Sequence, residues 1–215
     1  MADAAGLRTG DRRTARWLIP AAAAGVVALG IWRRRANRAR GARHYWRAKM
    51  PFRVNAVPGE LERIGVRPGL RVLEVGCGPG VYAEMAARMV EPGGALSAVD
   101  PVPEMVSLAS RRLAAQGLDI EVAQADARKL PYADATFDLA YLVGALGGMA
   151  DREEALREVR RVLRPEGVLA VTEHLADPAY LPASAVTRAC SAAGFEPAES
   201  TGGAWDHTSR FRRPG

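Results

Sequence analysis

A chain of 215 residues with 48% apolar residues is long enough for one folded domain plus an extension, and too apolar for general disorder. Its net charge of +6 is unevenly spread, because residues 1–49 carry twelve Lys/Arg and two Asp, which leaves residues 50–215 at −4. A mildly acidic body matches a nucleic-acid backbone poorly, so nucleic acid is not expected as a partner. Cys77 and Cys190 form no CxxC pair and stand at no metal-ligand spacing, which excludes a disulfide framework and predicts no bound metal.

Residues 17–32 (WLIPAAAAGVVALGIW) form an uncharged stretch with arginines on both sides. As a helix it would be about 24 Å long, which is shorter than the roughly 30 Å hydrocarbon core of a bilayer. The flanking arginines can reach the headgroups, and a tryptophan at each end suits the interface. We therefore expect membrane association through this helix. The larger positive charge on its C-terminal side favours a body in the cytoplasm, and without the anchor the protein would be cytoplasmic.

Other interpretations of this segment stay open. A cleaved signal peptide has a similar length and start, and the twin arginines Arg12-Arg13 raise the same question of export. An Ala-rich helix could also lie in the interface or pack on the body. The small-residue pairs Ala21/Gly25 and Ala24/Ala28 would let two such helices pack closely, which predicts a homodimer as one outcome.

From residue 51 onward, strand and helix patterns alternate, which places a boundary between a basic segment 1–50 and a folded body 51–215. Strands are predicted at 71–75, 95–99, 120–125, 137–143, 167–173, 195–200 and 205–212, and helices at 81–90, 103–117, 151–163 and 182–193. Asp151 is expected to cap the third of these helices. The last two strands are joined by a short glycine turn and must form a hairpin. The predicted fold is α/β: a Rossmann-like, doubly wound, seven-stranded sheet with an antiparallel strand 7, preceded by the hydrophobic helix.

The most informative stretch is residues 72–80 (VLEVGCGPG), where the first strand ends in a GxGxG turn that opens a helix. Glycines at such a turn let a ligand approach the backbone closely and leave amide groups at a helix N-terminus. A dinucleotide site would favour GxGxxG to hold a pyrophosphate. Here residue 81 is valine, and Glu74 would repel a pyrophosphate but suit a cationic amino group.

This stretch resembles the first motif of class I S-adenosylmethionine-dependent methyltransferases, and the compact body resembles the ubiquinone/menaquinone type of small-molecule enzyme. The resemblance covers roughly residues 52–212 and implies S-adenosylmethionine as the cofactor. It implies that Asp100 holds the ribose hydroxyls, which a carboxylate accepts well. The other residues that it assigns to the cofactor are Glu74, Gly76, Cys77, Gly78 and Gly80 for the methionyl part, and Pro101, Val102, Met105, Asp126 and Ala127 for the adenine.

The residues that would act on the methyl acceptor are less well marked. Tyr141, Glu173 and His174 stand near the ends of the fourth and fifth predicted strands, where ligands bind in such sheets. Tyr141 could equally be a core residue, and His174 a residue of the rim. Gly147-Gly148 occupy the place where related small-molecule enzymes often have a histidine, so the catalytic residue is left unassigned, with Tyr141 and His174 as candidates.

The sequence therefore predicts methyl transfer to a small acceptor, and proximity to a membrane would suit a lipophilic one such as a quinone precursor, a phospholipid amine or a hydrophobic thiol. The Asn/Asp-Pro-Pro-aromatic signature of amino-methylating enzymes is absent after the fourth strand. Two alternatives remain: a membrane-tethered module that binds S-adenosylmethionine without turnover, and a nucleic-acid methyltransferase that uses the basic segment as an arm. A nicotinamide oxidoreductase is disfavoured by the glycine spacing.

Overall fold

A computed structural model describes residues 57–203 and 205–215 of the chain. The predicted hydrophobic helix at 17–32 and the predicted boundary at residue 50 lie outside these residues. Within the described part of the chain, no helix is both long and apolar enough to cross a membrane. The association with a membrane therefore stays a prediction from the sequence.

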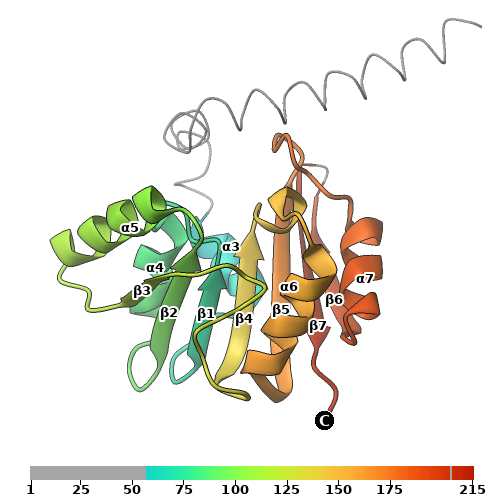
Figure 1. Ribbon diagram of the computed structural model, residues 1–215, viewed down its shortest axis with the longest axis horizontal. Helices are drawn as coiled ribbons and strands as arrows, with labels where there is room; N and C mark the ends of the chain where they lie inside the picture. Colours follow the sequence, from blue (N-terminus) through green and yellow to red (C-terminus); the bar gives the residue numbers. More distant parts are fainter. Residues whose placement is uncertain (1–56, 204) are drawn as a thin grey trace, which may run out of the picture. The chain divides into compact units, whose positions relative to one another are not determined.

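The described residues form a seven-stranded sheet in the order β3-β2-β1-β4-β5-β7-β6 (Figure 1). Strands β1 to β5 run parallel to one another, and the terminal hairpin adds β7 antiparallel to β5 and β6 antiparallel to β7. Their bounds are β1 Arg71–Val75, β2 Ala95–Asp100, β3 Glu121–Gln124, β4 Phe137–Val143, β5 Leu163–His174, β6 Glu196–Gly202 and β7 Asp206–Arg212. The Rossmann-like sheet with an antiparallel seventh strand is confirmed.

Helices cover both faces of this sheet, because each inner strand alternates its apolar side chains between two cores. On β1, Val72 packs with residues of the helices before and after it, whereas Leu73 and Val75 face the later helices. The first core joins the sheet to α3 (Val57–Ile64), α4 (Val81–Met89) and α5 (Pro103–Ala115), and the second joins it to α6 (Arg152–Val162), α7 (Ala183–Ala192) and the 3-10 turn η1 (Leu146–Gly148). Because helices bury both faces of this sheet, a ligand is expected at the edge where the carboxyl ends of the strands meet.

Two elements differ from the sequence prediction. Helix α3 lies where no element is predicted, and it forms by burying Leu61 and Ile64 completely although its first turn contains Pro58 and Gly59. Strand β5 begins at Leu163, four residues before the predicted start, because Leu163 pairs with Phe137 across a shift in register. The predicted cap of α6 is confirmed, since the carboxylate of Asp151 accepts a hydrogen bond from the backbone N–H of Glu154 at 3.0 Å.

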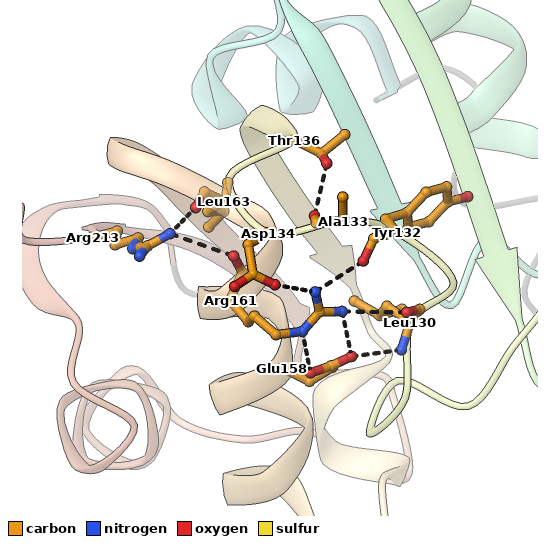
Figure 2. Close-up of polar contacts among 9 residues, drawn as sticks. All are labelled: Leu130, Tyr132, Ala133, Asp134, Thr136, Glu158, Arg161, Leu163 and Arg213. Carbon is orange, nitrogen blue, oxygen red and sulfur yellow. Dashed lines mark hydrogen bonds and ion pairs between the residues drawn. The ribbon is translucent and has the colours of Figure 1, made fainter.

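The loop before β4 is fixed to α6 by one guanidinium group, that of Arg161 (Figure 2). Arg161 donates to both carboxylate oxygens of Glu158, at 2.8 and 2.7 Å, and to the carboxylate of Asp134 at 2.6 Å. It also donates to the carbonyl oxygens of Tyr132 and Leu130, at 2.9 and 3.3 Å. Glu158 in turn accepts from the backbone N–H of Leu130 at 2.8 Å. Arg161 therefore determines where the connection from β3 enters β4.

Replacing Arg161 by alanine removes this set of bonds and leaves the loop carbonyls without their donor. We expect the free energy of unfolding to fall by about 1–2 kcal/mol, since charged hydrogen bonds are strong but this side chain is one-third exposed. Arg157→Ala on the same helix is the matched control, because Arg157 is exposed and forms its ion pair with the exposed Glu153, so its loss should be much smaller. Urea unfolding followed by circular dichroism measures both, and equal losses would contradict the role of Arg161.

Candidate functional site

The carboxylate of Asp100, at the end of β2, joins two of the segments predicted to hold the cofactor. One oxygen accepts from the backbone N–H of Gly78 and the other from that of Val102, both at 2.9 Å. Asp100 is only 7% exposed, and each of its oxygens keeps a further lone pair after these bonds. The structure therefore brings the glycine turn and Asp100 together at the carboxyl ends of β1 and β2, with acceptor capacity left for hydroxyl groups.

The glycine turn is itself held against β2. The backbone N–H groups of Gly76 and Cys77 both donate to the carbonyl oxygen of Val99, at 2.8 and 3.0 Å. Gly76 has a φ of +80°, and a Cβ there would lie 2.8 Å from the Cβ of Ala145, which follows β4. Glycine is required at this position for both reasons. The close approach links the turn to the segment that would face a methyl acceptor.

Glu74 is a buried acid directly beneath the turn. Its side chain is 2% exposed, and the hydroxyl of Tyr141 donates to it at 2.9 Å. Burial raises the pKa of Glu74 to about 8, although the Tyr141 hydrogen bond lowers it, and the nearby Asp100 raises it further. Much of Glu74 is therefore protonated at neutral pH. A cation placed beside it would favour the ionised form.

The other residues predicted for the cofactor lie around this edge in different environments. Cys77 is buried, and burial raises the pKa of its thiol, so it is no thiolate nucleophile. Met105 is buried on α5, whereas Pro101 is exposed. Asp126 is exposed and binds the guanidinium of Arg128 at 2.7 Å, and this hydrogen bonding lowers its pKa to about 2.

The segment that carries Asp126 lies next to Asp100, because the backbone N–H of Ala125 donates to the carbonyl oxygen of Asp100 at 3.2 Å. Ala127, by contrast, is 9% exposed and packs in the core beneath α6 and α7. Asp126 is thus the member of this pair whose side chain reaches the surface. An adenine amino group could reach it only alongside Arg128.

On the acceptor side, the structure separates the two candidate catalytic residues. Tyr141 is fully buried in the core on the α3 and α4 face, and its hydroxyl is directed to Glu74. His174 lies at the end of β5, where its Nε2 atom contacts a carboxylate oxygen of Glu60 at 3.0 Å. The hydroxyl of Tyr82 donates to the other oxygen of Glu60 at 2.5 Å. A buried carboxylate of this kind fixes the orientation of an imidazole ring.

Glu60 was not predicted from the sequence, because it lies on α3, which was itself missed. The only signal for it is an acid within a short amphipathic segment, and such acids are usually solvated. Here Glu60 is 3% exposed. Glu173, the neighbour of His174, is fully buried. Of the two, His174 is therefore the residue whose side chain is partly open at this edge.

The glycine pair after β4 has a steric explanation. A Cβ on Gly147 would lie 1.7 Å from the carbonyl oxygen of Ala179, in the segment between β5 and α7. No side chain fits at Gly147 unless that segment moves. A histidine in this place, as in related enzymes, is excluded by the packing of the two loops.

A cavity of about 410 Å³ lies at the opposite, amino edge of the sheet and is lined by charged residues such as Arg67, Asp138, Arg164 and Arg210. It is separated from Asp100 and the glycine turn by the length of the strands. Among the described residues, no group of three or more His, Cys, Asp or Glu side chains could hold a metal ion.

Comparison with known proteins agrees with the geometry of the cofactor side. A family model described as "Methyltransferase domain" matches residues 72–167. The chain is 38% identical over 113 residues to the ubiquinone/menaquinone biosynthesis C-methyltransferase UbiE of Laribacter hongkongensis, a match that covers 53% of this chain and 46% of that protein. It is also 38% identical over 114 residues to the methyltransferase GfsG of Streptomyces halstedii, covering 52% and 40% of the two chains. The chain thus spans about half the length of the curated relatives it matches.

Solved structures resemble the described fold as well. A SAM-dependent methyltransferase from Aquifex aeolicus superposes with a TM-score of 0.75 at 23% identity, covering 80% of this chain and 98% of that one. The [4+2]-cyclase SpnF superposes with a TM-score of 0.65 at 21% identity, covering 75% and 81%. These likenesses concern the fold alone, and the second belongs to a protein named for a different reaction.

The strand order agrees with the fold of the SAM-dependent methyltransferase from Aquifex aeolicus, and the glycine turn and the acid at the end of β2 lie together at one edge of that sheet. Through residues 72–167 the chain is similar to class I methyltransferases, which implies S-adenosylmethionine as the cofactor. The donor set fits that cofactor, since buried Glu74 suits a cation and Asp100 retains lone pairs for hydroxyl groups.

Substituting Glu74 tests its buried, neutral state. Because its folded-state pKa of about 8 lies above the ordinary value of 4.5, the folded protein keeps a proton that the unfolded chain releases between these values. The stability contributed by protonated Glu74 is therefore complete below pH 4.5 and is lost as the pH rises through about 8. Relative to Glu74→Gln, which cannot ionise, the wild type should lose stability between about pH 5 and 9. Urea unfolding at several pH values measures this, and a constant difference would contradict it.

Proposed function

We propose that this protein transfers the methyl group of S-adenosylmethionine to a small, lipophilic acceptor. The observation that carries the proposal is the Asp100 carboxylate, which is almost buried, hydrogen-bonded to the glycine turn, and still able to accept two hydroxyl groups. S-adenosylmethionine, when bound, supplies an electrophilic methyl group on a positively charged sulfur. The residues of this chain bind and orient it and receive the proton that the acceptor loses.

Two carboxylic acids, Asp100 and Glu74, would bind different parts of the cofactor. Asp100 is held in place by the N–H groups of Gly78 and Val102 and would accept the ribose hydroxyls. Glu74 is buried, so its charged form is costly until a cation arrives. The methionyl amino group beside the turn would provide that cation. Pro101 and Met105 would flank the adenine, and Asp126 and Ala127 would lie near the amino group of the adenine.

His174 is the residue that we propose to receive the acceptor's proton. It lies at the carboxyl end of β5, on the same edge as Asp100, and its ring is oriented by Glu60 at 3.0 Å. The imidazole ring is the group that would take the proton. Tyr141 is fully buried and bound to Glu74, so its role is to support that acid and not to touch the acceptor.

The acceptor class is proposed from two sources. The relative from Laribacter hongkongensis is named for ubiquinone and menaquinone biosynthesis. The uncharged stretch 17–32 with its flanking arginines favours membrane association of this chain, with the folded domain on the cytoplasmic side. Both support a lipophilic acceptor such as a quinone precursor. A homodimer through the small residues of this stretch remains a prediction. Nucleic acid is not expected as a partner, because residues 50–215 are mildly acidic.

Calorimetric titration of the full chain with S-adenosylhomocysteine tests the cofactor site, because this product analogue binds without turnover. Asp100→Ala should weaken binding by roughly tenfold to a hundredfold, the value of one or two charged hydrogen bonds. Asp119→Ala is the matched control, since Asp119 is exposed in the loop between α5 and β3 at the other edge. NAD should give no heat. Undiminished binding by Asp100→Ala would reject the assignment of the site, and no binding at all would reject the cofactor.

Transfer of a tritiated methyl group from S-adenosylmethionine tests turnover, with a prenylated naphthohydroquinone, phosphatidylethanolamine and a long-chain thiol as acceptors. We expect label in one of these, and a loss of about a hundredfold in kcat for His174→Ala. Glu60→Gln should lower kcat less, and both variants should bind S-adenosylhomocysteine like the wild type. Binding without transfer to any acceptor would favour a binding module over an enzyme. Full activity of His174→Ala would remove His174 from the mechanism.

A further inference from the structure

The large apolar side chains that are exposed in the described residues lie at one edge of the sheet. They are Val102, Leu175 and Trp205, at 36%, 47% and 77% exposure. Val102 follows β2 and Leu175 follows β5, both at the carboxyl edge. Trp205 precedes β7, which runs antiparallel to β5 and begins where β5 ends, with Asp206 opposite His174. The edge that carries the candidate site is therefore also the edge where apolar groups meet solvent.

Leu175 and Trp205 form one patch, and contacts of neighbouring residues hold the backbone around it in place. The backbone N–H of Leu175 donates to the carbonyl oxygen of Trp205 at 2.9 Å, so the two residues are neighbours although 30 positions apart. Asp206, next to Trp205, is ion-paired with Arg63 of α3. His207 is held by the carbonyl oxygen of Leu181 at 2.9 Å. These contacts fix the hairpin in a position that leaves the indole in solvent. We name the two exposed side chains, Leu175 and Trp205, the Trp205–Leu175 patch.

The preceding part of the chain enters the folded domain at this same edge. Helix α3 begins at Val57, and Glu60 in its first turn contacts His174 at the end of β5. Its last residues lead to β1, whose first residue lies at the amino edge. The described domain therefore begins, at Val57, at the edge that carries the Trp205–Leu175 patch. The residues before Val57 include the uncharged stretch 17–32 and the arginines on both sides of it.

We propose that the Trp205–Leu175 patch docks on a lipid bilayer and holds the carboxyl edge of the sheet against the membrane surface. An indole has an apolar body and one N–H donor, and such groups are favoured at the boundary between headgroups and acyl chains. The basic segment that joins at this edge is attracted to anionic lipids, which supplies affinity that two side chains alone would lack. The patch therefore orients the domain, and the preceding segment holds it there.

Docking in this orientation has a consequence for the proposed reaction. Leu175 directly follows His174 at the end of β5, and Trp205 is bonded to Leu175, so an acceptor dissolved in the bilayer would meet the site without crossing water. This consequence rests on the proposed function, whereas the docking does not. Failure of one can thus be told apart from failure of the other, because docking is measured without cofactor or acceptor.

The fluorescence emission of Trp205 reports whether its own indole lies in water or in lipid. The full chain has four tryptophans, so replacing Trp17, Trp32 and Trp46 by phenylalanine leaves only Trp205 to emit. With vesicles of phosphatidylcholine and phosphatidylglycerol, its emission should shift by about 10 nm to shorter wavelength and be quenched by lipids brominated near the headgroup. In the native background, Trp205→Gln with Leu175→Gln should weaken vesicle binding by about tenfold.

The matched control moves the reporter to the far edge: Asp119→Trp in a chain whose four tryptophans are phenylalanine. Its emission should stay that of an indole in water when the vesicles bind. Vesicle binding that leaves Trp205 in water would overturn the proposal in favour of an anchor alone. Emission of Trp205 that is already shifted without lipid would mean that the patch is covered by the preceding segment or, if sedimentation shows a dimer, by a second copy. Absence of vesicle binding would overturn it outright.

Discussion

The hydrogen bonds from the glycine turn and from Val102 to the carboxylate of Asp100 are the constraint on which the site depends. Through them, one side chain at the end of β2 fixes the end of β1 and the start of α5 together. A parallel sheet brings these strand ends to one edge, but their relative positions within an ångström depend on contacts of this kind. Because the carboxylate is nearly buried, few water molecules can reach its unused lone pairs.

Glu74 adds an electrostatic requirement to this geometry. It occupies the face of β1 that packs on α3 and α4, and Tyr141 on the neighbouring β4 satisfies one of its oxygens. An acid that burial holds partly neutral is a poor partner for an anion and a good one for a cation. In the proposed function, Asp100 and Glu74 would therefore act on different parts of the ligand, one by accepting hydroxyl groups and one by balancing positive charge.

The family model covers one part of the carboxyl edge of the sheet and leaves the other part out. The matched family model covers residues 72–167, which contain the glycine turn, Asp100 and Glu74. Glu60, His174 and the Trp205–Leu175 patch all lie outside that range. A shared cofactor requires the first half to be similar among relatives, whereas each acceptor requires its own second half. The acceptor of this protein is thus to be sought through α3, the end of β5 and the terminal hairpin.

The sequence alone determined the alternation of strands and helices, the hairpin that makes β7 antiparallel, the cap at Asp151 and the cofactor class. Each follows from neighbours in sequence: apolar runs of strand length, a turn too short for a crossover, and a glycine motif followed by an acid at the next strand end. Only the tertiary structure decided that Tyr141 is a buried partner of Glu74, that Glu60 orients His174, and that Gly147 leaves no room for a side chain. These contacts join residues from 32 to 114 positions apart, and α3 exists only because the sheet buries Leu61 and Ile64. Local propensity carries no information on such contacts, because they depend on how packed elements meet.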